Sequence, residues 1–197
     1  IRGYILTTGR ANPSNAMGNF LILDACCVLN FLASDRLTSI LTAIPQSIAI
    51  AEYVYTEEVL PIQANLFGTA EQSNVLQTQI NSGVLIITAL NSGVEENTLV
   101  NLAASMHDGE ANTCAIALCR RWDIASDDHK VLAVIRRLAP HIRVVTTPEV
   151  LKHWADSTQV SADQLSTVLK NIQQRANYWP GQKHVLYSWW QTAINRK

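Results

Sequence analysis

The chain has 197 residues and a formal net charge of −1, with 48% hydrophobic and 16% charged residues. This composition is that of an ordinary globular protein, and the length predicts one domain with a sizeable core. No apolar stretch reaches the roughly eighteen residues of a membrane span, and no signal segment opens the chain, so we expect a cytoplasmic protein with no membrane partner.

The first sixteen residues show no clear periodicity and end just before Met17. We expect residues 1–16 to be a vector-derived tag and leave them out of the fold prediction. The rest is predicted to form one domain over 17–157 and a helical C-terminal extension over 158–197, packed on that domain or appended to it.

The first predicted strand ends directly at a carboxylate. Leu21-Ile22-Leu23 precedes Asp24, and an apolar segment of helical length follows. Such a short apolar run is typical of a buried parallel strand, which places Asp24 at the strand end where open α/β sheets bind ligands. Asp is also a favoured helix N-cap, and taken alone the residue favours that role.

Strands and helices alternate along the next part of the chain. Further strands are predicted at 47–50, 84–88, 123–126 and 142–145, and helices at 35–44, 51–60, 71–80, 94–105, from 108, at 129–138 and from 147. Pro61 is predicted to end the helix 51–60, and Asp108 to cap the helix that carries Glu110. The alternation specifies an α/β fold with a parallel sheet. After Thr158 only helices are predicted, the first opened by a capping box at 161–164.

Carboxylates recur at strand ends and helix starts of the predicted domain. They are Asp24, Glu57 or Glu58, Glu110, and Asp127 with Asp128. Converging carboxylates repel one another, so we expect a hard cation, Mg²⁺ or Mn²⁺, between them. Such a cation polarises a phosphoryl oxygen and lowers the pKa of a bound water, which points to phosphate chemistry.

Charge is unevenly distributed along the chain. Residues 17–150 hold seven Lys and Arg against fourteen Asp and Glu, whereas residues 151–197 hold six against two. The acidic part argues against simple electrostatic binding of nucleic acid and fits a cation site. The basic residues of the extension are candidates for RNA phosphate contacts: Lys152, Lys170, Arg175, Lys183, Arg196 and Lys197.

Four segments occur in the order of the acidic motifs of PIN-domain proteins, and the chain resembles this family of metal-dependent ribonucleases, which includes the VapC toxins. The segments are LILDACCVLN, YVYTEEVL, DGEANTCAIAL and SDDHKVLAVIRR, and they span about residues 19 to 145. The resemblance implies a three-layer α/β/α PIN-like fold with a central parallel sheet, Mg²⁺ or Mn²⁺ as cofactor, and hydrolysis of RNA phosphodiester bonds.

The resemblance also assigns residues. The catalytic acids would be Asp24, Glu58, Glu110 and Asp128, and the metal ligands Asp24, Glu110, Asp127 and Asp128. Glu57 stays open as an alternative to Glu58, and Asp127 as an alternative or companion to Asp128. Weaker candidates for binding or orienting the substrate are Asn30, Ser126 and Lys130.

The chain departs from the family pattern at two places. His129-Lys130 follows the acidic pair where many members place Arg, and the extension after Thr158 exceeds a minimal PIN domain. We expect the extension to bind a partner or the substrate. The implied partners are RNA, an antitoxin protein if the chain is the toxin of a toxin–antitoxin pair, and a second copy in a homo-oligomer.

Other interpretations fit the residues less well. A receiver domain needs two acids after the first strand and a Lys after the last, and a phosphatase with an Asp nucleophile needs an Asp where Cys26 stands. The histidines and cysteines lack the spacing of metal sites, and the cysteines are predicted to be buried free thiols. The aromatic residues of the extension are predicted to be packing anchors rather than base-stacking platforms. The rival class is a PIN-like module without catalysis, whose acids serve as caps.

Overall fold

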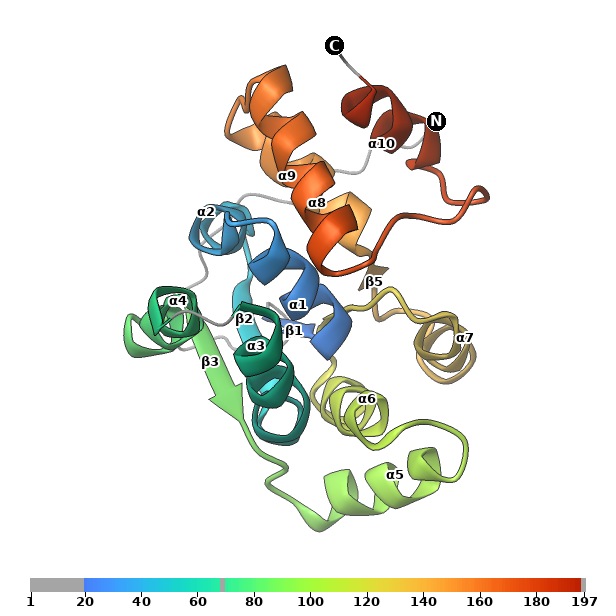
Figure 1. Cartoon of the computed structure of the whole chain (residues 1–197). Coiled ribbons are helices and arrows are strands. Elements are labelled where there is room, and N and C mark those ends of the chain that lie inside the picture. Colours follow the sequence, from blue (N-terminus) through green and yellow to red (C-terminus); the bar gives the residue numbers. More distant parts are fainter. Residues whose placement is uncertain (1–19, 68–69, 196–197) are drawn as a thin grey trace.

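In a computed structural model, the described residues are 20–67 and 70–195, with side chains described for all of them except 64–73. Five strands among these residues form one parallel sheet in the order β3-β2-β1-β4-β5 (Figure 1). The strands are β1 (Phe20–Leu23), β2 (Ser47–Ala51), β3 (Leu85–Thr88), β4 (Asp123–Ala125) and β5 (Val144–Val145). The predicted α/β fold with a parallel sheet is confirmed, and the predicted tag over 1–16 lies outside the described residues.

Helices cover both faces of the sheet and make it the middle of three layers. Between β1 and β2 lie α1 (Ala25–Ala33) and α2 (Leu37–Ala43), and between β3 and β4 lie α5 (Gly93–Ala103) and α6 (Asp108–Arg120). Helix α6 contacts β1, β2 and β4 and packs between α5 and α7 (His129–Leu138). Because parallel crossovers are right-handed, α1 and α2 lie on the opposite face.

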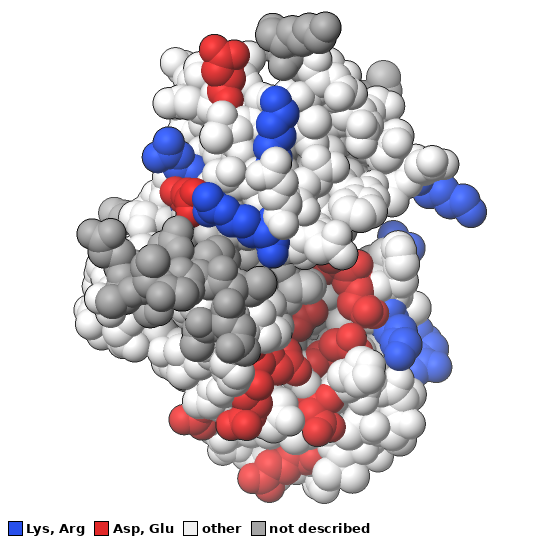
Figure 2. Space-filling model, in the orientation of Figure 1, with Lys and Arg blue, Asp and Glu red and all other residues white. Residues whose placement is uncertain are grey.

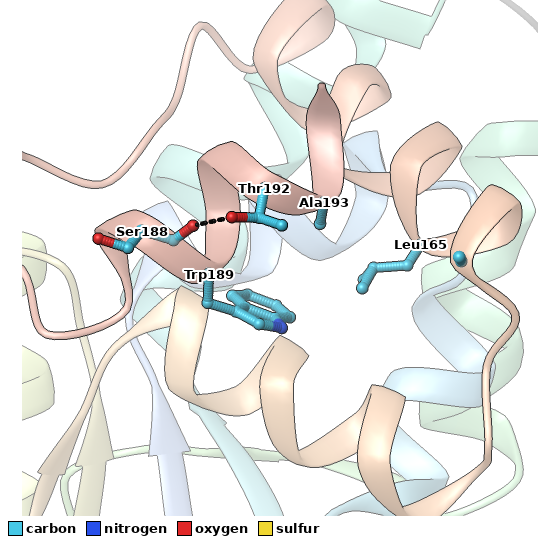
Figure 3. Close-up of a pocket in the computed structure, with 6 residues that line it drawn as sticks. Leu165, Ser188, Trp189, Thr192 and Ala193 are labelled. Atoms are coloured by element: carbon cyan, nitrogen blue, oxygen red, sulfur yellow. Dashed lines mark hydrogen bonds between the residues drawn. The ribbon is translucent and has the colours of Figure 1, made fainter. Parts of the chain in front are cut away.

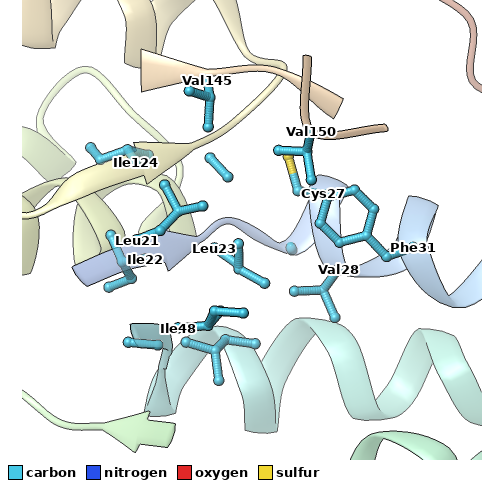
Figure 4. Close-up of a cluster of buried hydrophobic side chains, with 14 of the residues drawn as sticks. Leu21, Ile22, Leu23, Cys27, Val28, Phe31, Ile48, Ile124, Val145 and Val150 are labelled. Atoms are coloured by element: carbon cyan, nitrogen blue, oxygen red, sulfur yellow. The ribbon is translucent and has the colours of Figure 1, made fainter. Parts of the chain in front are cut away.

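The core is continuous from the sheet into α1. Strand β1 is central and has helices on both faces, so Leu21, Ile22 and Leu23 are all buried. Figure 4 shows these residues beside Val28 and Phe31 of α1. Burying one such side chain stabilises the fold by about 1.5–3 kcal/mol, so this packing fixes the backbone on both sides of Asp24.

The helical region after β2 differs from the prediction. The π-helix η2 (Val54–Val59) follows β2, and the chain continues through Pro61 in α3 (Leu60–Phe67) before α4 (Ala70–Asn81). The prediction that Pro61 ends the helix is wrong. The Leu60 N–H bonds to the carbonyl of Tyr55, five residues back, and this wider turn gives the proline ring room that an α-helix would not give.

The C-terminal helices are part of the same packed body. Helix α8 (Thr147–Ser157) contacts α1 and α2, and α9 (Ala162–Arg175) contacts α1 and α10 (Tyr187–Ile194). Leu169 and Ile172 of α9 and Trp190 of α10 have no exposed surface. Deleting the extension would therefore uncover the core, and its role has to be tested by substitutions.

Candidate functional site

The four predicted catalytic acids lie near one another around the carboxyl ends of β1 and β4, but among the described residues no three of them bring ligand atoms within 4.8 Å of one another. We call Asp24, Glu58, Glu110 and Asp128 the acidic cluster. The charge of Asp24 acts on Glu58 and on Glu110, and the charge of Asp128 acts on Asp24 and on Glu110. Figure 2 shows acidic side chains gathered across the lower half of this face, with most Lys and Arg side chains above or beside them.

Asp24 lies deepest in the acidic cluster, with 4% of its surface exposed. It is the N-cap of α1, and its Oδ1 accepts a hydrogen bond from the Ala25 N–H at 2.9 Å. Its Oδ2 accepts from the Ser126 hydroxyl at 2.8 Å and from the Cys26 thiol at 3.4 Å. Asp24 therefore has both roles that the sequence left open, because it caps a helix and faces other acids.

Glu58 reaches the cluster from the π-helix η2 and lies against Gly109 of α6. A Cβ atom at position 109 would overlap the Glu58 carboxylate, and the Gly109 backbone hydrogen-bonds to Glu58. Gly early in a helix costs stability relative to Ala, and the close approach of Glu58 explains it here. Glu57, the alternative that the sequence left open, is exposed. Its charge is not among the main causes that raise the pKa of Glu58.

Glu110 and Asp128 are held by helix capping. Glu110 Oε2 accepts from the His107 N–H at 3.3 Å in a capping box, so His107 rather than Asp108 is the N-cap of α6 and the sequence assignment is corrected. Asp128 caps α7, with its Oδ1 accepting from the Lys130 and Val131 N–H groups. Each cap uses one carboxylate oxygen and leaves the second without a hydrogen bond among the described residues.

Burial and mutual repulsion raise the pKa values of three of these acids. Desolvation is the largest cause for Asp24, Glu58 and Glu110, and the charges of neighbouring cluster acids add to it. In the described part of the chain no Lys or Arg forms an ion pair with the cluster, and only His107 offers a nearby positive charge to Glu58 and Glu110. The cluster therefore concentrates negative charge without a matching protein cation.

Asp127 is not part of the acidic cluster. Its Oδ1 accepts from the Thr147 N–H at 2.9 Å and the Tyr178 hydroxyl at 2.8 Å, and its Oδ2 from the Thr147 hydroxyl at 2.6 Å and the Asn30 amide at 3.1 Å. We call Asp127 with these three residues the Asp127 pocket. Four donors occupy the carboxylate, so the structure gives no support to Asp127 as a metal ligand alongside Asp128.

The three weaker candidates have structural contacts. Asn30 belongs to the Asp127 pocket and also donates to the Thr147 hydroxyl. Ser126 links two acids, because its hydroxyl donates to Asp24 and accepts from the Asp128 N–H at 3.1 Å. Lys130 is exposed as the second residue of α7, whose N-cap is Asp128. Ser126 therefore orients the cluster, and only Lys130 is free to reach a substrate.

Two cysteines lie near Asp127, and three donor atoms of Cys26, Cys27 and Asp127 lie within 4.8 Å of one another. Burial raises the pKa of the Cys27 thiol, which disfavours the thiolate that binds metals. Since the Asp127 oxygens are also occupied, this group fits a metal poorly. Cys114, beneath the acidic cluster, has a pKa raised to about 12, mainly by burial and further by the acids.

Sequence reasoning missed several residues that shape the two sites. His107 and Gly109 were not recognised beside Glu110, and Thr147 and Tyr178 were not connected with Asp127. A Gly within the first turn of a helix was the one available signal for Gly109. Tyr178 lies 51 residues from Asp127 in the chain, and no local pattern could pair them.

A hollow elsewhere on the molecule has a different lining. Figure 3 shows Leu165 of α9 opposite Trp189, Thr192 and Ala193 of α10, around a cavity of about 330 Å³. Its lining contains no titratable side chain. This hollow therefore offers no acid or base for hydrolysis.

No family model, curated protein or solved structure matches this chain. None of the helices in the described part of the chain combines the length and the apolar character needed to cross a bilayer.

Proposed function

We propose that the protein is a divalent-metal-dependent ribonuclease that hydrolyses RNA phosphodiester bonds at the acidic cluster. The observation that carries the proposal is the convergence of Asp24, Glu58, Glu110 and Asp128 from four separate parts of the fold. The resemblance of their four motifs to PIN-domain ribonucleases supports the choice of RNA, and we place the protein in the cytoplasm on the same basis.

The acidic cluster has the donor chemistry of a hard-cation site, although its carboxylates would have to move closer together to share one ion. Its four side chains offer only oxygen donors, which suit Mg²⁺ and Mn²⁺ better than softer metals. Glu110 and Asp128 each keep one oxygen without a hydrogen bond among the described residues. A cation there would offset the repulsion that raises the pKa values of Asp24, Glu58 and Glu110.

The residues of the site would have different roles in metal binding, orientation and proton exchange. Glu110 and Asp128 would hold the cation through the oxygens left free by the described residues, and Asp24, whose two oxygens accept hydrogen bonds, would attract it by its charge. Ser126 orients Asp24 and Asp128 by its hydrogen bonds to both. When bound, a divalent cation polarises a phosphoryl oxygen and increases the acidity of a water molecule. The pKa of Glu58, raised mainly by burial, suits a group that exchanges a proton with water.

The biological setting that we propose is that of a toxin with an antitoxin protein as partner, acting as a homo-oligomer. This part of the proposal rests on the family resemblance alone. A neighbouring gene for a small partner protein would support it, and co-purification of the two gene products would test it.

A second function is favoured by a specific observation, the use of three cluster acids as helix caps. Asp24 and Asp128 are N-caps, and Glu110 completes a capping box. A non-catalytic module that binds protein or RNA could keep these acids for capping alone. The two functions differ in whether a cation stabilises the fold.

Thermal unfolding of the parent and of Asp24→Asn, with chelator and with manganese, separates the two functions. Asn keeps the cap and removes one charge, and the Ser126 hydroxyl and Cys26 thiol can rotate to accept from its N–H₂ group, so the metal-free variant should be as stable as the parent or more stable. Manganese at a hundredfold excess over its dissociation constant should stabilise the parent by about 2.7 kcal/mol and the variant much less.

Glu57→Gln is the matched control, because it removes a charge outside the cluster and should keep the full manganese effect. Cleavage of a single-stranded RNA by the parent, dependent on manganese, would complete the test. A parent that ignores manganese, together with a strongly destabilised Asp24→Asn, would show that Asp24 is only a cap.

A further inference from the structure

The tryptophans of the C-terminal part differ sharply in exposure. Trp190 has no exposed surface and Trp154 has 3%, as expected for packing anchors. Trp179 has 53% of its surface exposed. An indole left half exposed in this otherwise well packed region is available for a ligand.

The backbone fixes Trp179 on both sides. Its neighbour Tyr178 is tied to Asp127 by a hydrogen bond of 2.8 Å, and Pro180 is buried. The residue before a proline is restricted to extended conformations, which limits the freedom of Trp179 further. His184 binds the Thr146 hydroxyl at 3.0 Å and holds the other end of the segment. The contacts of the residues around Trp179 therefore fix the backbone that carries the indole.

Through Tyr178 this segment is joined to the residues next to the acidic cluster. Asp127, which binds Tyr178, stands between Ser126 and Asp128, and its N–H bonds to the Cys26 sulfur that also contacts Asp24. Figure 1 shows the segment after α9 running past β5 on its way to α10.

The surroundings of Trp179 favour RNA over a protein partner. The other exposed side chains of the segment between α9 and α10 are polar or basic except for one, namely Asn177, Gln182 and Lys183 with Val185 as the apolar exception. A single ring among such residues is not the contiguous apolar patch that marks protein interfaces. An aromatic ring close to cations is typical of surfaces that bind single-stranded nucleic acid.

We propose that the Trp179 indole is a stacking platform for one base of a single-stranded RNA whose phosphodiester lies at the acidic cluster. The proposal rests on the proposed ribonuclease function and adds that the substrate is unpaired next to the cleavage point. A stacked base also offers affinity that does not depend on charge, which is useful where the RNA backbone meets clustered carboxylates.

The test is the binding of a labelled single-stranded RNA of about ten nucleotides, followed by fluorescence anisotropy with manganese present. Glu58→Gln is the host for all variants so that the RNA stays intact, and cleavage by the parent is measured in parallel. Trp179→Ala should weaken binding roughly 5- to 150-fold, and Trp179→Phe should recover much of the loss. Val185→Ala, which changes a 71% exposed residue of the same segment, should bind like the host.

A second RNA identifies the contact. With abasic sites in place of the bases, Trp179→Ala and the host should bind equally, because no base is left to stack. Equal binding of the intact RNA by host and Trp179→Ala would overturn the proposal while parent cleavage left the ribonuclease function standing. Loss of a dimer in sedimentation of Trp179→Ala, without change in RNA binding, would assign the ring to a protein interface instead.

Discussion

Asp127 and Asp128 are neighbours in the chain, but their carboxylates lie in opposite environments. Asp127 accepts hydrogen bonds from Thr147, Tyr178 and Asn30. Asp128 faces Asp24 and Glu110, and the described residues give none of these acids a Lys or Arg partner in an ion pair. The carboxylate of Asp127 is therefore held by hydrogen bonds within the fold, whereas the negative charge of Asp128 lies where an added cation could neutralise it.

The largest effect is expected from exchanging each of these acids for its amide. Asp127→Asn replaces an acceptor oxygen with an N–H₂ group among buried donors, so the free energy of unfolding should fall by about 2–4 kcal/mol. Asp128→Asn keeps a good N-cap and removes repulsion, so its change should stay within about 0.5 kcal/mol. Urea unfolding of the metal-free proteins measures both values.

A milder change probes the same pocket if Asp127→Asn is too unstable to purify. Tyr178→Phe removes one donor to Asp127 and should cost about 1 kcal/mol. Equal stability losses for the Asp127 and Asp128 variants would contradict the distinction between the pocket and the cluster.

The second prediction concerns Glu58, which the sequence interpretation preferred, and Glu57, which it left open as the alternative. Glu58→Gln removes an acid of the cluster and should lower the rate of RNA cleavage at least about a hundredfold, or 2.7 kcal/mol. Glu57→Gln changes an exposed side chain and should leave the rate close to that of the parent. The reverse ranking in a steady-state cleavage assay would remove Glu58 from the site.

The third prediction separates folding from metal binding at one position. Gly109→Ala should raise the metal-free stability by up to about 1 kcal/mol, because Ala is the better helix residue and only the end of the Glu58 side chain has to move. Displacing that carboxylate should weaken manganese binding about tenfold. Calorimetric titration with manganese measures the affinity, and unchanged affinity would show that Glu58 lies outside the metal site.

The smallest effect is expected from pH. The folded protein binds protons more readily than the unfolded chain at Asp24, Glu58 and Glu110, because their pKa values are raised. Metal-free stability should therefore increase as the pH falls from 7 towards about 5, and decrease as it rises again. Glu58→Gln should reduce this slope in thermal unfolding. A parent whose stability falls over the same interval would contradict the pKa values raised by burial and by the neighbouring acids.

At still lower pH the stability of the metal-free protein should decrease as the pH falls. Glu95 has a lowered pKa, mainly because it accepts hydrogen bonds from Arg120, and its protonation removes that stabilisation. The loss should begin below the ordinary pKa of a Glu, about 4.3.

The sequence by itself determined most of the architecture. Local patterns placed the strands, because a buried parallel strand has to be short, apolar and bounded by turn residues. They also located α7 over 129–138 and the capping box at Ser161, since caps depend on residues that are close in the chain. The acids Asp24, Glu110 and Asp128 could be found for the same reason, because each follows a strand or opens a helix.

Only the tertiary structure decided which side chains meet. Glu58 is distinguished from Glu57 by the direction of the η2 turn and by the space at Gly109. Asp127 is separated from Asp128 because Thr147 and Tyr178, distant in sequence, supply its donors. These outcomes depend on contacts between segments that are distant in the sequence, and a local sequence pattern carries no information about the energies of such contacts. The sequence could therefore identify the acids but could not assign each one its environment.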